Sequence, residues 1–100
     1  MKTLYHASKI ENKEWILKEG LEPSLSEKES NDERLNTEAV YGFDNPEDCM
    51  GFAMDNGMDE FVIFQFRSDS CIIDPEYDGE SFAVTGTENI PCTIFKEYLR

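Results

Sequence analysis

The sequence predicts a single α+β domain with a mostly antiparallel sheet and two helices. Three observations lead to this prediction. A chain of 100 residues is long enough for one domain with one modest core. Two segments carry the signals that start a helix, and six shorter segments have the length and residue types of strands. Four of those strand segments follow one another after the second helix, with no sequence repeat and no sign of a second domain.

The first strand and the first helix are predicted at the start of the chain. Residues 3–6, Thr-Leu-Tyr-His, indicate a short strand. Ser8 and Glu11 fit a capping box, because a hydroxyl at the N-cap and a carboxylate three residues later satisfy free N–H groups. We therefore expect a helix over residues 9–19 with one broad apolar face. Gly20 stands where a left-handed residue ends a helix.

Residues 22–37 are polar and charged and have no sustained hydrophobic period, which predicts a long, mobile acidic loop. A loop of this length is unusual in so small a domain and is often functional. A plain acidic connector fits the same residues equally well.

A second strand and a second helix are predicted next. Residues 38–43 indicate a strand, and Gly42 within it indicates the close approach of a backbone or ligand, or a bulge. Residues 44–48, Asp-Asn-Pro-Glu-Asp, combine a capping side chain, an early proline and acids that suit a helix start. This helix is expected to run to about Asp55. It should bury Cys49, Phe52 and Ala53.

The remaining strands complete the predicted sheet. Residues 61–66 are nearly all apolar, which favours a central strand covered on both faces. Shorter strands are predicted over residues 71–73, 81–85 and 93–98. Residues 74–79 contain proline, glycine and aspartates and predict a turn.

Charge limits the classes of partner. The formal net charge is −13, which opposes direct binding of nucleic acid or of an anionic membrane and favours a basic partner. No apolar run approaches the roughly 20 residues that span a bilayer, and the first residues lack a signal-peptide pattern. We therefore expect a cytoplasmic protein. Three widely spaced cysteines and one histidine give no metal-ligand spacing, so we expect free thiols and no metal site.

Three residues are candidates for chemistry. His6 ends the first strand beside a predicted helix start, where it could bind a polar ligand while Ser8 and free N–H groups receive an anion. Tyr41, next to Gly42, could offer its ring as a stacking platform. Glu80 opens a strand and could orient a sugar hydroxyl or stabilise a cationic sugar transition state. His6 and Tyr41 also have a purely structural interpretation, as a residue of a polar rim and as a core or half-exposed strand tyrosine. For Asp74, Glu76 and Asp78, which precede Glu80, a plain acidic turn is favoured.

The order and surroundings of three short motifs resemble the ADP-ribosyltransferase superfamily. The branch is the His-Tyr-Glu one, which includes the poly-ADP-ribose-polymerase-like enzymes and small bacterial and phage proteins. Residues 4–8, Leu-Tyr-His-Ala-Ser, look like its first motif. Residues 40–43, Val-Tyr-Gly-Phe, look like the second. Residues 79–84, Gly-Glu-Ser-Phe-Ala-Val, look like the third. The resemblance extends over nearly all of the chain and implies a small split β-sandwich with a cleft for NAD, the family's substrate, between its sheets.

The resemblance also implies a role for each matching residue. His6 would hydrogen-bond a ribose of NAD, and Ser8 would support the adenosine ribose. The backbone around His6 and Ala7 would bind the carboxamide, and Tyr41 would stack on nicotinamide. Glu80 would hold a ribose hydroxyl and stabilise the oxocarbenium-like transition state. Six of the nine basic residues lie in the first 34, so an anionic ligand would find cations there, with Arg34 and Lys9 as candidates.

Two functions are consistent with these observations. The first is an NAD-dependent mono-ADP-ribosyltransferase, a glycosyltransferase that releases nicotinamide and modifies a macromolecule. The net charge favours a basic, nucleic-acid-binding protein as the acceptor. The alternative is a non-catalytic acidic binding protein, such as a phage-type inhibitor of host defence, that imitates nucleic acid and blocks a basic surface.

Overall fold

The computed structural model describes residues 1–24, 38–73 and 81–100. They form one six-stranded sheet in the order β4-β5-β2-β1-β3-β6, and every neighbouring pair of strands is antiparallel. The strands are β1 (Lys2–Lys9), β2 (Ala39–Phe43), β3 (Phe61–Ser68), β4 (Ile72–Ile73), β5 (Ser81–Thr85) and β6 (Thr93–Tyr98). The helices are α1 (Lys13–Glu19), preceded by a 3₁₀ turn (Ile10–Asn12), and α2 (Pro46–Asp55). The predicted α+β class with two helices is confirmed.

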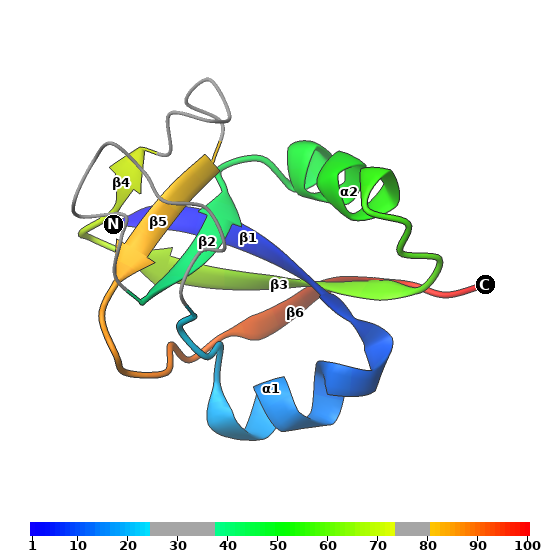
Figure 1. The fold of residues 1–100 in the computed structure, drawn as a ribbon, viewed down its shortest axis with the longest axis horizontal. Coiled ribbons are helices and arrows are strands. Elements are labelled where there is room, and N and C mark those ends of the chain that lie inside the picture. Colours follow the sequence, from blue (N-terminus) through cyan, green and yellow to red (C-terminus); the bar gives the residue numbers. More distant parts are fainter. Residues whose placement is uncertain (25–37, 74–80) are drawn as a thin grey trace.

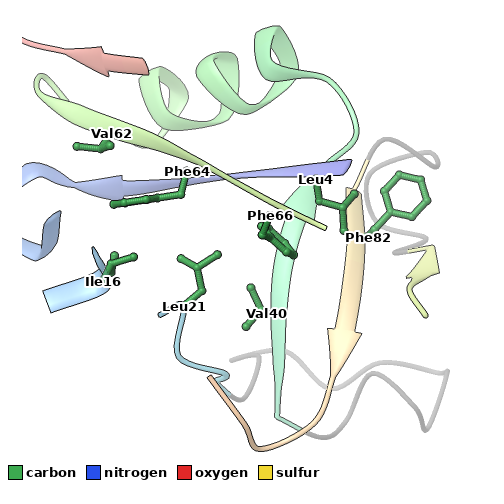
Figure 2. Packing of buried hydrophobic residues seen from close by; sticks show 8 residues of the cluster. All are labelled: Leu4, Ile16, Leu21, Val40, Val62, Phe64, Phe66 and Phe82. Atoms are coloured by element: carbon green, nitrogen blue, oxygen red, sulfur yellow. The ribbon is translucent and has the colours of Figure 1, made fainter. Parts of the chain in front are cut away.

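β3 contributes side chains to two of the three hydrophobic clusters among the described residues. Successive side chains of a strand point to opposite faces of the sheet. Val62, Phe64 and Phe66 therefore belong to a first core, shown in Figure 2. Phe61 and Ile63 belong to a second core. The prediction that this apolar run forms a central strand, covered on both faces, is confirmed.

Each helix covers one face of the sheet, as Figure 1 shows. α1 contributes Ile16 to the first core, and Leu21 follows just beyond its end. α2 contributes Cys49 and Ala53, both fully buried, to the second core. Phe52, expected to be buried, is only half-buried. None of the helices in the described segments is long and apolar enough to span a membrane.

The pairing between neighbouring long strands of the sheet is shortest between β1 and β2. β1 pairs with β3 along eight residues, but its pairing with β2 is confined to Tyr5 opposite Phe43. The sheet thus has two three-stranded halves, β4-β5-β2 and β1-β3-β6, that meet at this junction. Strand pairing makes them a single sheet rather than two separate ones.

The predicted start of the first helix is wrong. β1 continues through Ser8 and Lys9, which pair with Val62 and Phe61 of β3. α1 begins only at Lys13, and its N-cap residue makes no side-chain hydrogen bond. Ser8 and Glu11 therefore form no capping box, because Ser8 takes part in the hydrogen-bonded pairing of β1 with β3. Ser8 does not lie at a helix start.

Other local signals agree with the structure. The Asn45 side chain accepts a hydrogen bond of 2.7 Å from the Glu47 backbone N–H, and α2 then begins at Pro46, as the residue pattern predicts. Gly20 ends α1 with a φ of 86°, a left-handed conformation that favours glycine. A Cβ at Gly20 would also lie 2.8 Å from the Ile90 carbonyl oxygen.

Gly42 is required by the first core rather than by a bulge. The pairing of β2 with β5 continues without interruption through Gly42 opposite Phe82. A Cβ at this position would lie 3.0 Å from the Phe66 ring and 3.1 Å from the Leu4 Cβ. The close approach that the sequence indicates is therefore made by core side chains.

Replacing Gly42 by alanine should destabilise the fold. The added methyl would press on Phe66 and Leu4, and overpacking of this kind costs about 1–3 kcal/mol. Gly51→Ala is a matched control, because a Cβ there meets nothing within 4 Å and alanine favours the interior of α2. Urea unfolding of both variants measures the effect. Equal stability of Gly42→Ala and wild type would contradict this account of the core.

Candidate functional site

His6 and Tyr41 lie on the two strands that diverge at the narrow junction. Tyr5 and Phe43 form the one pair that the structure describes between β1 and β2, and His6 is the next residue of β1. The His6 ring bridges the opening: its Nδ1 lies 2.7 Å from the Tyr41 carbonyl oxygen. The first and second sequence motifs thus meet in space, through a side chain of one and the backbone of the other.

This hydrogen bond fixes the proton positions of the His6 ring. A carbonyl oxygen can only accept, so Nδ1 must carry the proton. Burial lowers the pKa of His6, and the bond to Tyr41, which favours the charged ring, offsets only part of that effect. At neutral pH the ring is therefore uncharged, and its Nε2 carries a lone pair that can accept a hydrogen bond.

The two rings do not share one pocket wall. The Tyr41 side chain is half-buried and packs with Ala39 and Ala83, on the face of β2 away from the first core. His6 follows Leu4 by two residues on β1, so its side chain lies on the same face of the sheet as Leu4, which belongs to the first core. The structure therefore brings His6 to the Tyr41 backbone and leaves the Tyr41 ring against a different group of side chains.

One edge of β1 is open beside this junction. On one side His6, Ala7 and Ser8 pair with Phe64, Ile63 and Val62 of β3. On the other side no β-pairing among the described residues continues past Tyr5. Backbone groups on that edge can therefore bind a ligand, which is the role expected for the backbone around His6 and Ala7.

Glu80 and Arg34 lie outside the described residues, as do the acidic turn at 74–79 and most of the predicted loop at 22–37. Of that loop, residues 22–24 are described, and Ser24 forms an isolated bridge with Ala39. Glu80 directly precedes β5, whose first residue, Ser81, pairs with Phe43 at the junction.

Two of the three cysteines are poor candidates for a reactive group at this site. Cys49 is fully buried in the second core, and burial raises its pKa to about 12. Burial also raises the pKa of Cys92. Thiols with raised pKa values are poor nucleophiles and poor metal ligands. No group of three or more His, Cys, Asp or Glu side chains in the described segments could hold a metal ion.

Residues 84–91, between β5 and β6, surround an open hollow with a volume of about 520 Å³. The strand predicted over residues 81–85 includes the first two of these residues, and residues 86–91 carry the pattern of a loop. The glycine and proline among them were the available signal, but neither indicates a concave surface.

Comparisons of the chain with protein-family models, with curated proteins and with solved structures found no match.

The stability of the fold should fall as the pH drops below about 6.5, the ordinary pKa of histidine. The pKa of His6 is lowered in the folded state, so the unfolded chain takes up a proton first. The contribution of neutral His6 is complete above pH 6.5 and is lost toward its lower folded pKa, with a slope of up to about 1.4 kcal/mol per pH unit.

Urea unfolding between pH 8 and 5 measures this dependence. His6→Asn is the control, since its amide can still donate to the Tyr41 carbonyl but does not titrate. His6 is the one histidine of the chain, so the difference in slope between the two proteins isolates it. Identical slopes would show that His6 titrates as freely in the folded state as in the unfolded one.

Proposed function

We propose that the chain is an ADP-ribosyltransferase-like protein that binds NAD beside the β1–β2 junction and transfers ADP-ribose to a basic, nucleic-acid-binding protein. The observation that supports this proposal best is the hydrogen bond from His6 Nδ1 to the Tyr41 carbonyl. It joins two motifs that are 35 residues apart in the sequence, next to an open strand edge. The split sandwich of this superfamily remains part of the proposal and is compatible with the two half-sheets.

Binding follows from the groups around the junction. The Nε2 lone pair of neutral His6 accepts a hydrogen bond from a ribose hydroxyl. The open edge at Ala7 offers backbone groups to the carboxamide, and the Ser8 hydroxyl supports the adenosine ribose. The Tyr41 ring stacks on nicotinamide, which requires a ligand that reaches across the β2 edge. Arg34 supplies positive charge for the pyrophosphate.

The proposed reaction is a substitution at the ribose carbon C1′. The bond from C1′ to the nicotinamide nitrogen breaks, and its electron pair leaves with nicotinamide, which becomes neutral. The Glu80 carboxylate holds a ribose hydroxyl and stabilises the positive charge that develops on the sugar. A nucleophilic atom of the acceptor then bonds to C1′ and releases its proton to solvent.

NAD should raise the melting temperature of the protein. Ligand at about 100 times its Kd adds roughly 2.7 kcal/mol, which corresponds to about 10 °C in a domain of this size. Glu80→Gln should keep this shift but lose at least about 100-fold in nicotinamide release, because Glu80 acts in the transition state. Glu47→Gln, an exposed change on α2, is the matched control and should behave as wild type.

Two outcomes would contradict the proposal. The absence of any NAD-specific shift at millimolar concentration would remove the binding site. A shift accompanied by equal nicotinamide release from wild type and Glu80→Gln would remove Glu80 from the chemistry.

The acidic binding protein remains the second candidate because of the outer surface of α2. Glu47 and Asp55 are exposed on this helix, and Met54 between them is 62% exposed. Residues 44–60 contain no Lys or Arg, so the segment presents mostly unbalanced negative charge. An exposed apolar side chain among acids suits a basic partner with an apolar contact.

Neutralising this surface distinguishes the two candidates. The variant Glu47→Gln/Asp55→Asn should weaken binding of a basic target protein about tenfold or more if α2 is the docking surface. Glu80→Gln should then have no effect on target binding. Isothermal titration calorimetry with the same target measures both variants. Unchanged affinity in the double variant would exclude α2 as the contact.

A further inference from the structure

The hollow lined by residues 84–91 is a concave surface, and none of its lining residues belongs to the junction at His6. Figure 1 shows this connection, in orange, running from β5 toward β6 past the end of α1. Its volume of about 520 Å³ is within the range of small-molecule sites, about 300–1,000 Å³. We name it the 84–91 hollow.

Hydrogen bonds hold the 84–91 hollow on both sides. At its start, the Gly86 N–H donates to the Glu38 carbonyl over 3.0 Å. At its end, Leu21 and Ile90 exchange two backbone hydrogen bonds of 2.8 and 2.9 Å. The Asn89 side chain donates to the Glu19 carbonyl over 2.9 Å. The loop is thus fixed to α1 and to the segment before β2, and its shape is formed before any ligand arrives.

The lining offers acceptors and negative charge. Thr85 and Thr87 provide exposed hydroxyls, and Glu88 provides an exposed carboxylate. The lining contains no lysine, arginine or histidine. Val84 and Ile90 are only partly exposed and give the hollow an apolar part.

Further carboxylates lie on residues bonded to the loop. Glu19 and Glu38 are the residues whose carbonyls accept the hydrogen bonds of Asn89 and Gly86. Glu88 itself makes no ion pair with any residue in the described segments. A cation placed in the hollow would therefore meet the Glu88 carboxylate as an available counter-charge.

We propose that the 84–91 hollow binds an arginine side chain of a basic protein partner. A guanidinium has five N–H donors in a planar fork, and it can pair with the Glu88 carboxylate through two of them. The Thr85 and Thr87 hydroxyls can accept others, while the aliphatic stem lies along Val84 and Ile90. A lysine ammonium is a point charge with three donors and uses such an array less fully.

This site extends the proposed function by naming what the basic partner presents. It takes from that function only the expectation of a basic partner. Its test contains no NAD, so failure of one proposal is distinguishable from failure of the other.

Titration of ¹⁵N-labelled protein with the peptide acetyl-Gly-Arg-Gly-amide tests the proposal. The largest amide shifts should fall on residues 84–91. The same peptide with citrulline, which has the shape of arginine without its charge, should produce no comparable shift. Glu88→Gln should weaken the arginine peptide about tenfold, and Glu88 is exposed, so the spectrum should otherwise be unchanged.

Glu14→Gln on α1 is the matched control for loss of one exposed carboxylate and should bind the peptide as wild type does. Equal affinity of Glu88→Gln and wild type would overturn the proposal. Shifts spread over the acids of α2 rather than over residues 84–91 would overturn it too, because they would show general attraction to a negative chain.

Discussion

The alternating side chains of β3 are the constraint on which the rest of the structure depends. This strand lies between β1 and β6, and its apolar residues are shared between two cores on opposite faces. Each face must then be covered, and the two helices do this from opposite sides. The eight-residue ladder with β1 follows from the same strand, since it places Leu4 in the first core. A domain of 100 residues thus obtains two small cores from one continuous apolar run.

That ladder has a consequence for the candidate site. β1 pairs with β3 along its whole length. β2 pairs with β5 along its whole length, but with β1 only through Phe43 opposite Tyr5. The two half-sheets can therefore diverge immediately after Tyr5, and beyond it one edge of β1 has no strand partner in the part of the chain that the structure describes. His6 lies at this point, and its ring replaces the missing backbone pairing with a hydrogen bond to Tyr41. The same geometry leaves backbone groups of β1 beyond Tyr5 without a β2 partner among the described residues.

Much of the fold was predictable because its signals are local. Asn45 and the proline after it start α2, and Gly20 ends α1, through contacts within a few residues. The prediction that Ser8 caps the start of a helix was wrong. Ser8 pairs instead with Val62 of β3, which is distant in sequence, and this strand pairing is favoured over a local helix cap. Gly42 and His6 show the same limit. Their residue types indicated a close approach and a polar contact, but only the fold reveals Phe66 and the Tyr41 carbonyl as the partners.

The negative net charge of the chain repels one proposed ligand, NAD, and attracts the other, an arginine side chain. A pyrophosphate approaching a chain of charge −13 is repelled at long range, and neutral His6 does not compensate for that repulsion. NAD would therefore be held mainly by directed hydrogen bonds at the β1 edge, which salt screens little. An arginine side chain is attracted by the same field and meets a carboxylate at the 84–91 hollow, a contact that salt weakens. Long-range attraction would bring the partner, and short-range geometry would select the nucleotide.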